Sequence, residues 1–232
     1  MARGTQLLEL VAQLRAETGR TQKVSVGVDE VDNLKHNLKR TQETLYDSYE
    51  WPHLRVERTI TLNPGQRYYD LPSDLNYDRI QQVKFKYNNV YTEVERGIGF
   101  DDYSIFDSND DERSDPILKW DIRNTGSGEQ VEVWPIPNTT RSLHMFGTKN
   151  LGRLVEESDR ADLDDTLIVL TCAAEMLKRQ KSADADIKQA QANERLLILR
   201  RNSQSAARTI QVGQGNAARD KSNRLKTRII VS

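Results

Sequence analysis

The hydrophobic residues of this chain follow two different periods, and the period changes near residue 52 and again near residue 163. Outside these points, apolar residues recur every three or four positions, which predicts amphipathic helices. Between them, apolar and polar residues alternate over short runs, which is typical of half-buried strands. The predicted helices cover residues 5–18, 29–50, 164–181 and 184–201.

The most apolar predicted helix is Asp164–Gln180. Its apolar face is so wide that the helix must be buried on more than one side. Two acidic residues begin it and two basic residues end it, in the order that the helix dipole favours. We therefore expect the central helix of a bundle, with a core that includes Leu167, Leu170, Ala174 and Leu177.

The other predicted helices have weaker signals. Thr5 is a suitable N-cap for the first helix. The second helix should end by Trp51, because Pro52 disfavours the helical conformation in the residue before it. The last helix places four apolar residues on one side, namely Ile187, Ala190, Leu197 and Ile198.

The alternating segment predicts short strands joined by turns. Asn63-Pro64-Gly65 is predicted to join the first two strands as a hairpin, and Asn88-Asn89 to form a tight hairpin turn. Phe100–Phe106 is expected to form one helical turn with Tyr103 and Phe106 pointing inward. The predicted strands are Leu54–Leu62, Gln66–Leu71, Ile80–Tyr87, Val90–Glu95, Ile117–Arg123, Gln130–Ile136 and Ser142–Phe146.

Helices at both ends and strands in the middle indicate an α+β fold, in which a β insertion interrupts a four-helix bundle. The strands are too many and too short for a βαβ sheet, so an antiparallel sandwich or barrel-like insertion fits better. The predicted divisions are 1–52 and 151–203 for the two halves of the bundle, 53–150 for the insertion and 204–232 for an extended C-terminal arm.

The composition indicates that part of the chain is exposed or is ordered only by partners. Hydrophobic residues make up 36% and charged residues 30% of the chain, whereas about 45–50% and about 25% are usual. We find no run of about 18 apolar residues and no signal peptide. We therefore expect no membrane contact and a protein that is made in a cytosol-like compartment.

The C-terminal segment concentrates positive charge. From Arg195 to the end there are seven arginines and two lysines against one aspartate. The middle of this segment has nothing to bury and is interpreted as a flexible linker. The last eight residues recover strand propensity, so we expect an arm that becomes ordered on contact with a partner and adds a strand to it.

The sequence offers little for catalysis. We find no phosphate-binding, dinucleotide-binding or nucleophile-elbow motif. His36, His53 and His144 are far apart, and none has a second ligand at zinc spacing, so no metal or other cofactor is expected. His53 is predicted to pack at the edge of the bundle, and Cys172 is predicted to be a core residue rather than a nucleophile.

Acidic residues are concentrated in one part of the β segment, and the loop Asp107–Asp115 within it has no apolar anchor. It does not match a calcium-binding loop, which needs acids at alternate positions, a central glycine and a closing glutamate. Two interpretations stay open: a solvated loop, or a surface that repels nucleic-acid phosphates or meets a basic partner. The acidic residues of this part of the chain are Asp101, Asp102, Asp107, Asp110, Asp111, Glu112 and Asp115.

The order of several motifs resembles the head-to-tail adaptor proteins of tailed bacteriophages, also called connector or head completion proteins, especially those of short-tailed phages. The resemblance covers residues 5–201, and its specificity lies in the order of the motifs. These are Trp51-Pro52-His53-Leu54, the segment Gly65–Asp74 with Leu71-Pro72-Ser73-Asp74, the strand Ile80–Tyr87, Val131-Glu132-Val133-Trp134-Pro135-Ile136-Pro137 and the block Leu163–Gln180.

This resemblance implies a structural virion protein without enzymatic activity. Such adaptors form a ring, commonly of twelve copies, that docks under the portal at the head–tail junction, receives tail nozzle or hub proteins and lets DNA pass without sequence-specific contact. It implies a channel-lining or outward-facing role for the acidic loop. It also implies a portal-binding arm that includes Arg208, Arg219, Lys221, Arg224, Leu225, Lys226, Arg228, Ile229, Ile230 and Val231.

Two other functions remain open. The basic arm also suits nonspecific binding to nucleic-acid phosphates. Against this function, the arm has no aromatic residue to stack on bases, and DNA would make no use of its last apolar residues. A tail tube or nozzle subunit is the second alternative. Copurification with a portal ring, rather than with tail proteins only, separates this alternative from the adaptor.

Overall fold

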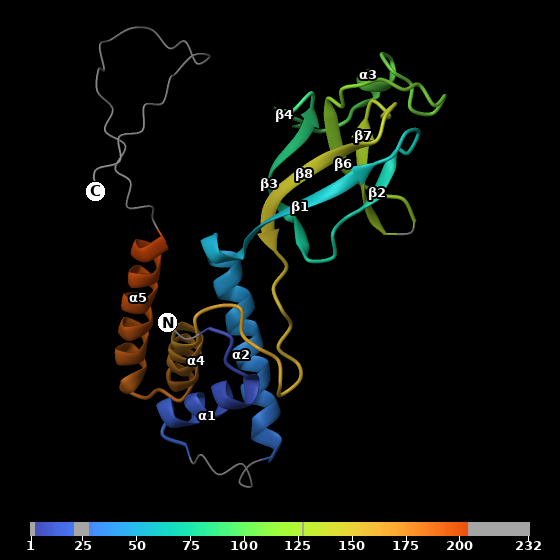
Figure 1. Ribbon diagram of the computed structural model, residues 1–232. Helices are drawn as coiled ribbons and strands as arrows, with labels where there is room; N and C mark the ends of the chain where they lie inside the picture. The colour runs from blue at the N-terminus through green and yellow to red at the C-terminus, as the bar shows by residue number, and fades with distance from the viewer. Residues whose placement is uncertain (1–2, 21–27, 127, 204–232) are drawn as a thin grey trace, which may run out of the picture.

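The computed structural model describes residues 3–20, 28–126 and 128–203. It is a mixed α+β chain in which four helices lie together and the β region extends away from them (Figure 1). These helices are α1 (Leu7–Glu17), α2 (Val28–Ser48), α4 (Asp165–Arg179) and α5 (Asp184–Ser203). Each predicted helix is therefore present, with bounds within about three residues of the prediction.

The β region contains two four-stranded sheets, with the orders β1-β8-β3-β4 and β2-β7-β6-β5. Residues from both sheets form one hydrophobic cluster, so the sheets share a core. The strands are β1 (Arg55–Leu62), β2 (Tyr68–Asp70), β3 (Leu75–Tyr87), β4 (Val90–Glu93), β5 (Glu95–Arg96), β6 (Lys119–Asn124), β7 (Glu129–Trp134) and β8 (Arg141–Lys149), and a short helix α3 (Phe100–Tyr103) follows β5.

Two predictions about strand pairing are wrong. The first two strands do not form a hairpin, because β1 pairs with β8 and β2 pairs with β7 in the other sheet. The turn after β1 instead carries the chain from one sheet to the other. The insertion is also not entirely antiparallel, since β5 pairs with β6 in parallel.

The hairpin between β3 and β4 is confirmed. Asn88 and Asn89 both have positive φ, at 46° and 62°. Positive φ at both central residues belongs to the turn whose twist matches that of the flanking strands, and asparagine tolerates it better than most residues.

Helix α4 is the central helix, as predicted. It contacts α1, α2 and α5, and ten of its side chains are buried around its circumference. All four predicted core residues, Leu167, Leu170, Ala174 and Leu177, are buried. The side chain of Asp164 accepts a hydrogen bond from the Leu167 N–H and so caps the first turn.

The expected cap of α1 is wrong. Gln6 precedes the helix and makes no side-chain cap. The Thr5 hydroxyl instead donates to the Asp165 carboxylate at 2.6 Å. Thr5 therefore joins the N-terminal segment to the start of α4 rather than satisfying the N–H groups of its own helix.

Helix α5 is apolar on two opposite sides. Ala185, Ala192 and Leu199 are buried, and α5 packs against α4. The side that carries Ile187, Leu197 and Ile198 is exposed instead. The apolar pattern that predicted this helix thus includes a surface that no described residue covers.

The helices and the β region have separate hydrophobic clusters. Tyr46 on α2 connects them: its hydroxyl donates to the Lys149 carbonyl at 3.0 Å and accepts from Asn76 at 3.1 Å. The Arg79 guanidinium lies over the Tyr46 ring, 4.1 Å from its centroid. This separation agrees with the idea of an inserted unit, while the exact divisions at residues 52, 150 and 203 stay predictions.

Candidate partner-binding site

The acidic loop predicted from the sequence, together with α3, covers one face of the second sheet. We call residues 98–115 the acidic tip. Val131 and Val133 on β7 point into the core, so Glu132 between them lies on the opposite side of the strand. Even so, Glu132 is 0% exposed, because side chains of the tip and of two arginines cover it.

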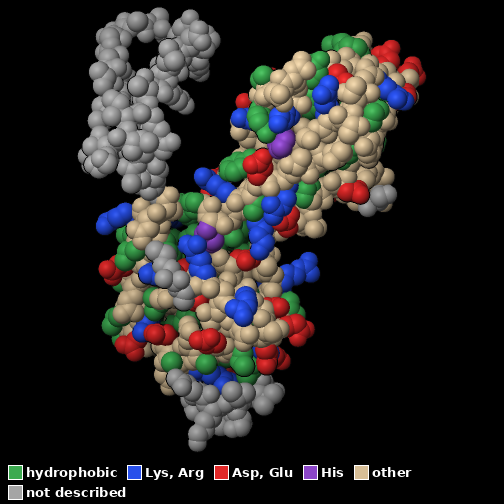
Figure 2. Space-filling model, viewed as in Figure 1, with side chains coloured by type: hydrophobic (Ala, Val, Ile, Leu, Met, Phe, Trp, Pro, Cys, Tyr) green, Lys and Arg blue, Asp and Glu red, His purple; other side chains and the backbone are tan. Residues whose placement is uncertain are grey.

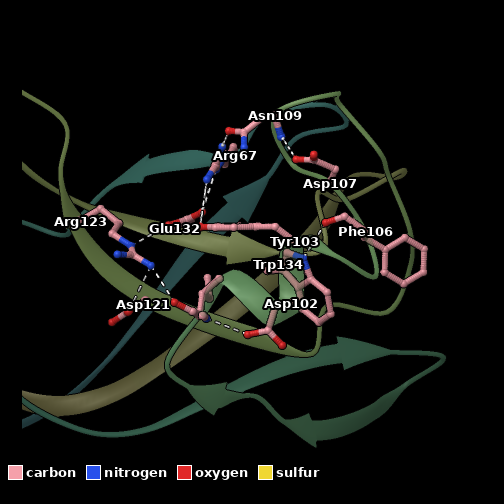
Figure 3. Close-up of polar contacts among 12 residues, drawn as sticks. Arg67, Asp102, Tyr103, Phe106, Asp107, Asn109, Asp121, Arg123, Glu132 and Trp134 are labelled. Atoms are coloured by element: carbon pink, nitrogen blue, oxygen red, sulfur yellow. Dashed lines mark hydrogen bonds and ion pairs between the residues drawn. The ribbon is translucent and has the colours of Figure 1, made fainter.

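Two arginines hold the Glu132 carboxylate (Figure 3). The Arg67 Nε donates to Glu132 Oε1 at 2.7 Å, and the Arg123 Nε donates to Oε2 at 2.9 Å. A buried carboxylate is tolerated only when it is paired and hydrogen-bonded, and here both oxygens are engaged. The same arginines reach the tip, since Arg123 donates to the Ile98 carbonyl and Arg67 to the Asn109 side chain.

Tyr103 joins α3 to the same carboxylate. Its hydroxyl donates to Glu132 Oε1 at 2.7 Å and accepts from Arg67 at 3.0 Å. Burial, followed by the hydrogen bond to Glu132, raises the pKa of the Tyr103 hydroxyl. The hydroxyl therefore stays protonated and remains a donor at neutral pH.

Asp102 is not part of the exposed acidic surface. Its carboxylate accepts from Lys119 on β6 at 2.7 Å and from the Gly99 N–H at 2.8 Å, and only 7% of the residue is exposed. The Lys119 side chain and the Gly99 N–H hold the pKa of Asp102 below its usual value. Asp102 thus fixes α3 to the sheet.

The acidic loop after α3 is held at its start by Phe106, the residue before Asp107. The Phe106 ring packs edge-on against Trp134, with 5.9 Å between centroids. The Trp134 indole N–H donates to the Phe106 carbonyl at 3.0 Å. The expectation that Tyr103 and Phe106 point inward is met in part, since both side chains are half-buried.

The remaining acids of the tip divide into three groups. Asp107, Glu112 and Asp115 accept hydrogen bonds from the Asn109 N–H, the Asp107 N–H and the Thr139 hydroxyl, respectively. Asp111 pairs with Arg113. Asp101 and Asp110 are exposed and have no polar side-chain partner among the described residues. The tip therefore combines internal carboxylates with an exposed acidic edge.

Two large apolar side chains lie exposed in the tip. Phe100 is 89% exposed and Ile105 is 65% exposed. Figure 2 shows hydrophobic and acidic side chains together at the end of the β region farthest from the helices. Sequence reasoning missed this pair, although the apolar residues that directly precede acids, in Phe100-Asp101 and Ile105-Phe106-Asp107, were the available signal.

Sequence reasoning also missed the support beneath the tip. Arg123 lies nine residues before Glu132 on the neighbouring strand, whereas Arg67 is 65 residues away, and strand pairing brings all three together. A single polar residue between two valines on a strand is normally exposed. The sequence therefore contains no local signal that Glu132 is buried.

The other candidate residues do not gather into a site. Every predicted arm residue from Arg208 to Val231 lies outside the described residues. His53 is exposed but, as predicted, packs at the edge of the bundle: its ring lies edge-on to Trp51, with 6.0 Å between centroids, and its Nε2 is 3.0 Å from the Asp162 carbonyl. Cys172 is buried as predicted, and burial raises the pKa of its thiol to about 11. It is therefore neutral at pH 7 and unsuited to act as a nucleophile.

The described residues form neither a metal-binding cluster nor a membrane-spanning helix. No group of three or more His, Cys, Asp or Glu side chains among them is arranged to hold a metal ion. No helix in the same part of the chain is long and apolar enough to cross a membrane.

A comparison with protein families decides the identity of the chain. A model of the SU10 adaptor protein family matches residues 5–219, which include all the described helices and strands. The chain belongs to the SU10 adaptor protein family. It is a bacteriophage head–tail adaptor and a structural component of the virion, in agreement with the resemblance seen in its motifs. No curated protein matches the chain.

Proposed function

We propose that this SU10 adaptor forms a ring, commonly of twelve copies in such adaptors, that joins the portal to the tail and continues the DNA channel. The observation that carries the proposal is the family match over residues 5–219. The adaptor acts at the head–tail junction of the virion, assembles in the host cytoplasm and needs no cofactor or catalytic step. Its partners are the portal, tail nozzle or hub proteins and further copies of itself.

The exposed side of α5 supports contact between copies. Ile187, Leu197 and Ile198 lie on one side of a regular helix, and Leu197 is 62% exposed. A helix that is apolar on two sides is normally buried on both. A neighbouring subunit would cover this second side, so Leu197→Asp should prevent ring formation on the portal while the subunit stays folded.

The C-terminal arm is the proposed attachment to the portal. Its basic residues suit an acidic groove, and its final apolar residues suit addition to a sheet edge. The family match ends at residue 219, so the apolar terminal segment Leu225–Ser232 lies beyond it. Arms that cross between subunits add contact area without a larger folded core.

The test is copurification of the full-length adaptor with purified portal rings and, separately, with tail complexes of the same phage. We expect a stable complex with the portal in the absence of the tail. Association with tail complexes only would favour a tail tube or nozzle subunit and would contradict the adaptor role.

The positive charge of the arm favours one second candidate, nonspecific binding to nucleic acid. Phosphate contacts by arginine and lysine weaken steeply as salt rises. Salt-dependent DNA binding that disappears on removal of residues 208–232, without any portal binding, would support this candidate over the adaptor.

A further inference from the structure

The acidic tip has the features of a preorganised protein-binding surface. Phe100 and Ile105 are exposed on a segment that is fixed from below by buried polar contacts. The two residues are five positions apart in one segment that also carries exposed acids, and exposed apolar surface rimmed by polar residues marks interaction sites in soluble proteins. A rigid anchor loses little conformational entropy on binding, which favours affinity.

The support under the anchors is specific. Asp102 and Tyr103 follow Phe100 in the same short helix and bond to Lys119 and Glu132 of the sheet. The chain beyond Ile105 is held by the Phe106–Trp134 contact. Both anchors therefore project from a backbone that the sheet holds on either side of them.

The charges around the anchors indicate the chemistry of the partner. Asp101, Asp110, Asp111 and Glu112 are exposed in the tip, and Arg113 is the exposed basic residue beside them. An acidic rim repels nucleic-acid phosphates and attracts a basic protein surface. Lining of a DNA channel would leave Phe100 and Ile105 facing water. The exposed acids and the exposed apolar side chains together favour, as the partner, a protein with an apolar pocket rimmed by lysine or arginine.

We propose that Phe100 and Ile105 are the anchors by which the adaptor binds a tail protein, through an apolar pocket with a basic rim. This inference rests on the proposed adaptor function and assigns the acidic tip to the tail side. The bound tail protein buries both side chains, while Asp101 and Asp110 pair with its basic rim.

The test uses the full-length adaptor bound to immobilised portal rings, with tail complexes purified from the same phage and stripped of adaptor as the probe. The variant Phe100→Ser/Ile105→Ser should weaken tail binding about thirtyfold, a loss typical of anchor residues. Val90→Ser is the control, because Val90 is an apolar residue of the β region outside the tip whose exposure, 63%, is close to the 65% of Ile105, and it should leave binding unchanged.

A charge variant tests the rim separately. Asp101→Lys/Asp110→Lys should slow association with the tail complex about tenfold and weaken its dependence on salt. Unchanged salt dependence would contradict the basic rim. Portal binding should be the same for every variant, since none of these residues belongs to the arm.

The outcomes separate this inference from the proposed function. Tail binding of the serine variant at wild-type strength overturns the inference and leaves the adaptor role intact. Self-association of the wild-type protein that the serine variant abolishes would assign the tip to a second copy and also overturn it. If the wild type fails to bind portal rings, the proposed function fails, and direct binding of the free protein to tail complexes still tests the anchors.

Discussion

The two buried carboxylates at the start of α4 differ in how completely they are paired. Arg195 holds Asp164 with two hydrogen bonds, of 3.0 and 2.7 Å. Asp165 next to it accepts one hydrogen bond, from Thr5, while its second oxygen is buried without a partner. Burial raises the pKa of Asp165 above its ordinary value.

Asp165→Asn should therefore stabilise the protein at pH 7. A carboxyl whose folded pKa is raised costs stability when it ionises, and this cost disappears as pH falls through the folded value. Leaving one carboxylate oxygen buried without a partner costs about 1–3 kcal/mol, which exceeds the favourable helix-dipole effect of the charge, about 0.3–1 kcal/mol. Chemical denaturation at pH 7 and pH 4 should show a stabilised variant at pH 7 and a smaller difference at pH 4. A variant that is less stable at pH 7 would contradict this.

Leu170→Asp should unfold the helical part. Leu170 is buried on α4, and an unpaired carboxylate there costs about 4 kcal/mol or more, against a usual total stability of about 5–15 kcal/mol. Circular dichroism should show a large fall in melting temperature. Leu197→Asp makes the same change on the exposed side of α5, where a surface substitution changes stability by about 0.5 kcal/mol at most. Equal melting temperatures for Leu170→Asp and the wild type would refute the central role of α4.

At the scale of elements, local patterns predicted which segments are helices and strands, and failed where pairing is set by distant residues. The period of Leu54–Leu62 predicted β1 because alternation is a local property. The turn at Asn63-Pro64-Gly65 did not reveal that the chain changes sheets there, since a turn after a strand is compatible with either partner. The two-residue strand β5 has no periodicity to detect.

The acidic tip depends on its side-chain contacts with the sheet, because its own helix has only four residues. Glu132→Gln removes the charge that Arg67 and Arg123 share. Both arginines are partly exposed, so water can replace the hydrogen bonds that they lose. We therefore expect the free energy of unfolding to fall by about 1–3 kcal/mol, less than the full penalty of an isolated buried charge.

Hydrogen–deuterium exchange should detect this change locally. In Glu132→Gln, amide exchange should accelerate in residues 98–112 and stay unchanged in α4. Glu93→Gln, on an exposed strand of the same region, should leave exchange in the tip as in the wild type. If the tip of Glu132→Gln exchanges its amide hydrogens as slowly as the tip of the wild type, the contacts of Glu132 do not hold the tip in place.

At the scale of the whole molecule, helical and strand segments are arranged as two hydrophobic clusters joined by polar contacts at Tyr46. The order of periods along the sequence predicted this division. The exposure of Phe100 or of the outer side of α5 was not predictable, because a pattern shows which residues are apolar and leaves open which of them a partner covers.

Removal of Arg208–Ser232 should leave the described helices and sheets folded and abolish binding to portal rings. The central core lies in residues 7–199, so the deletion removes none of it. Circular dichroism and portal binding measured on the same preparation check both parts. Full-strength portal binding by the truncated protein would assign attachment to another surface.

Electron cryomicroscopy of purified portal rings mixed with the full-length protein would show directly whether the protein is an adaptor. We expect a ring of this protein seated on the portal, with a channel continuous through both. Portal rings without added density, at protein concentrations that saturate binding to tail complexes, would contradict the adaptor role.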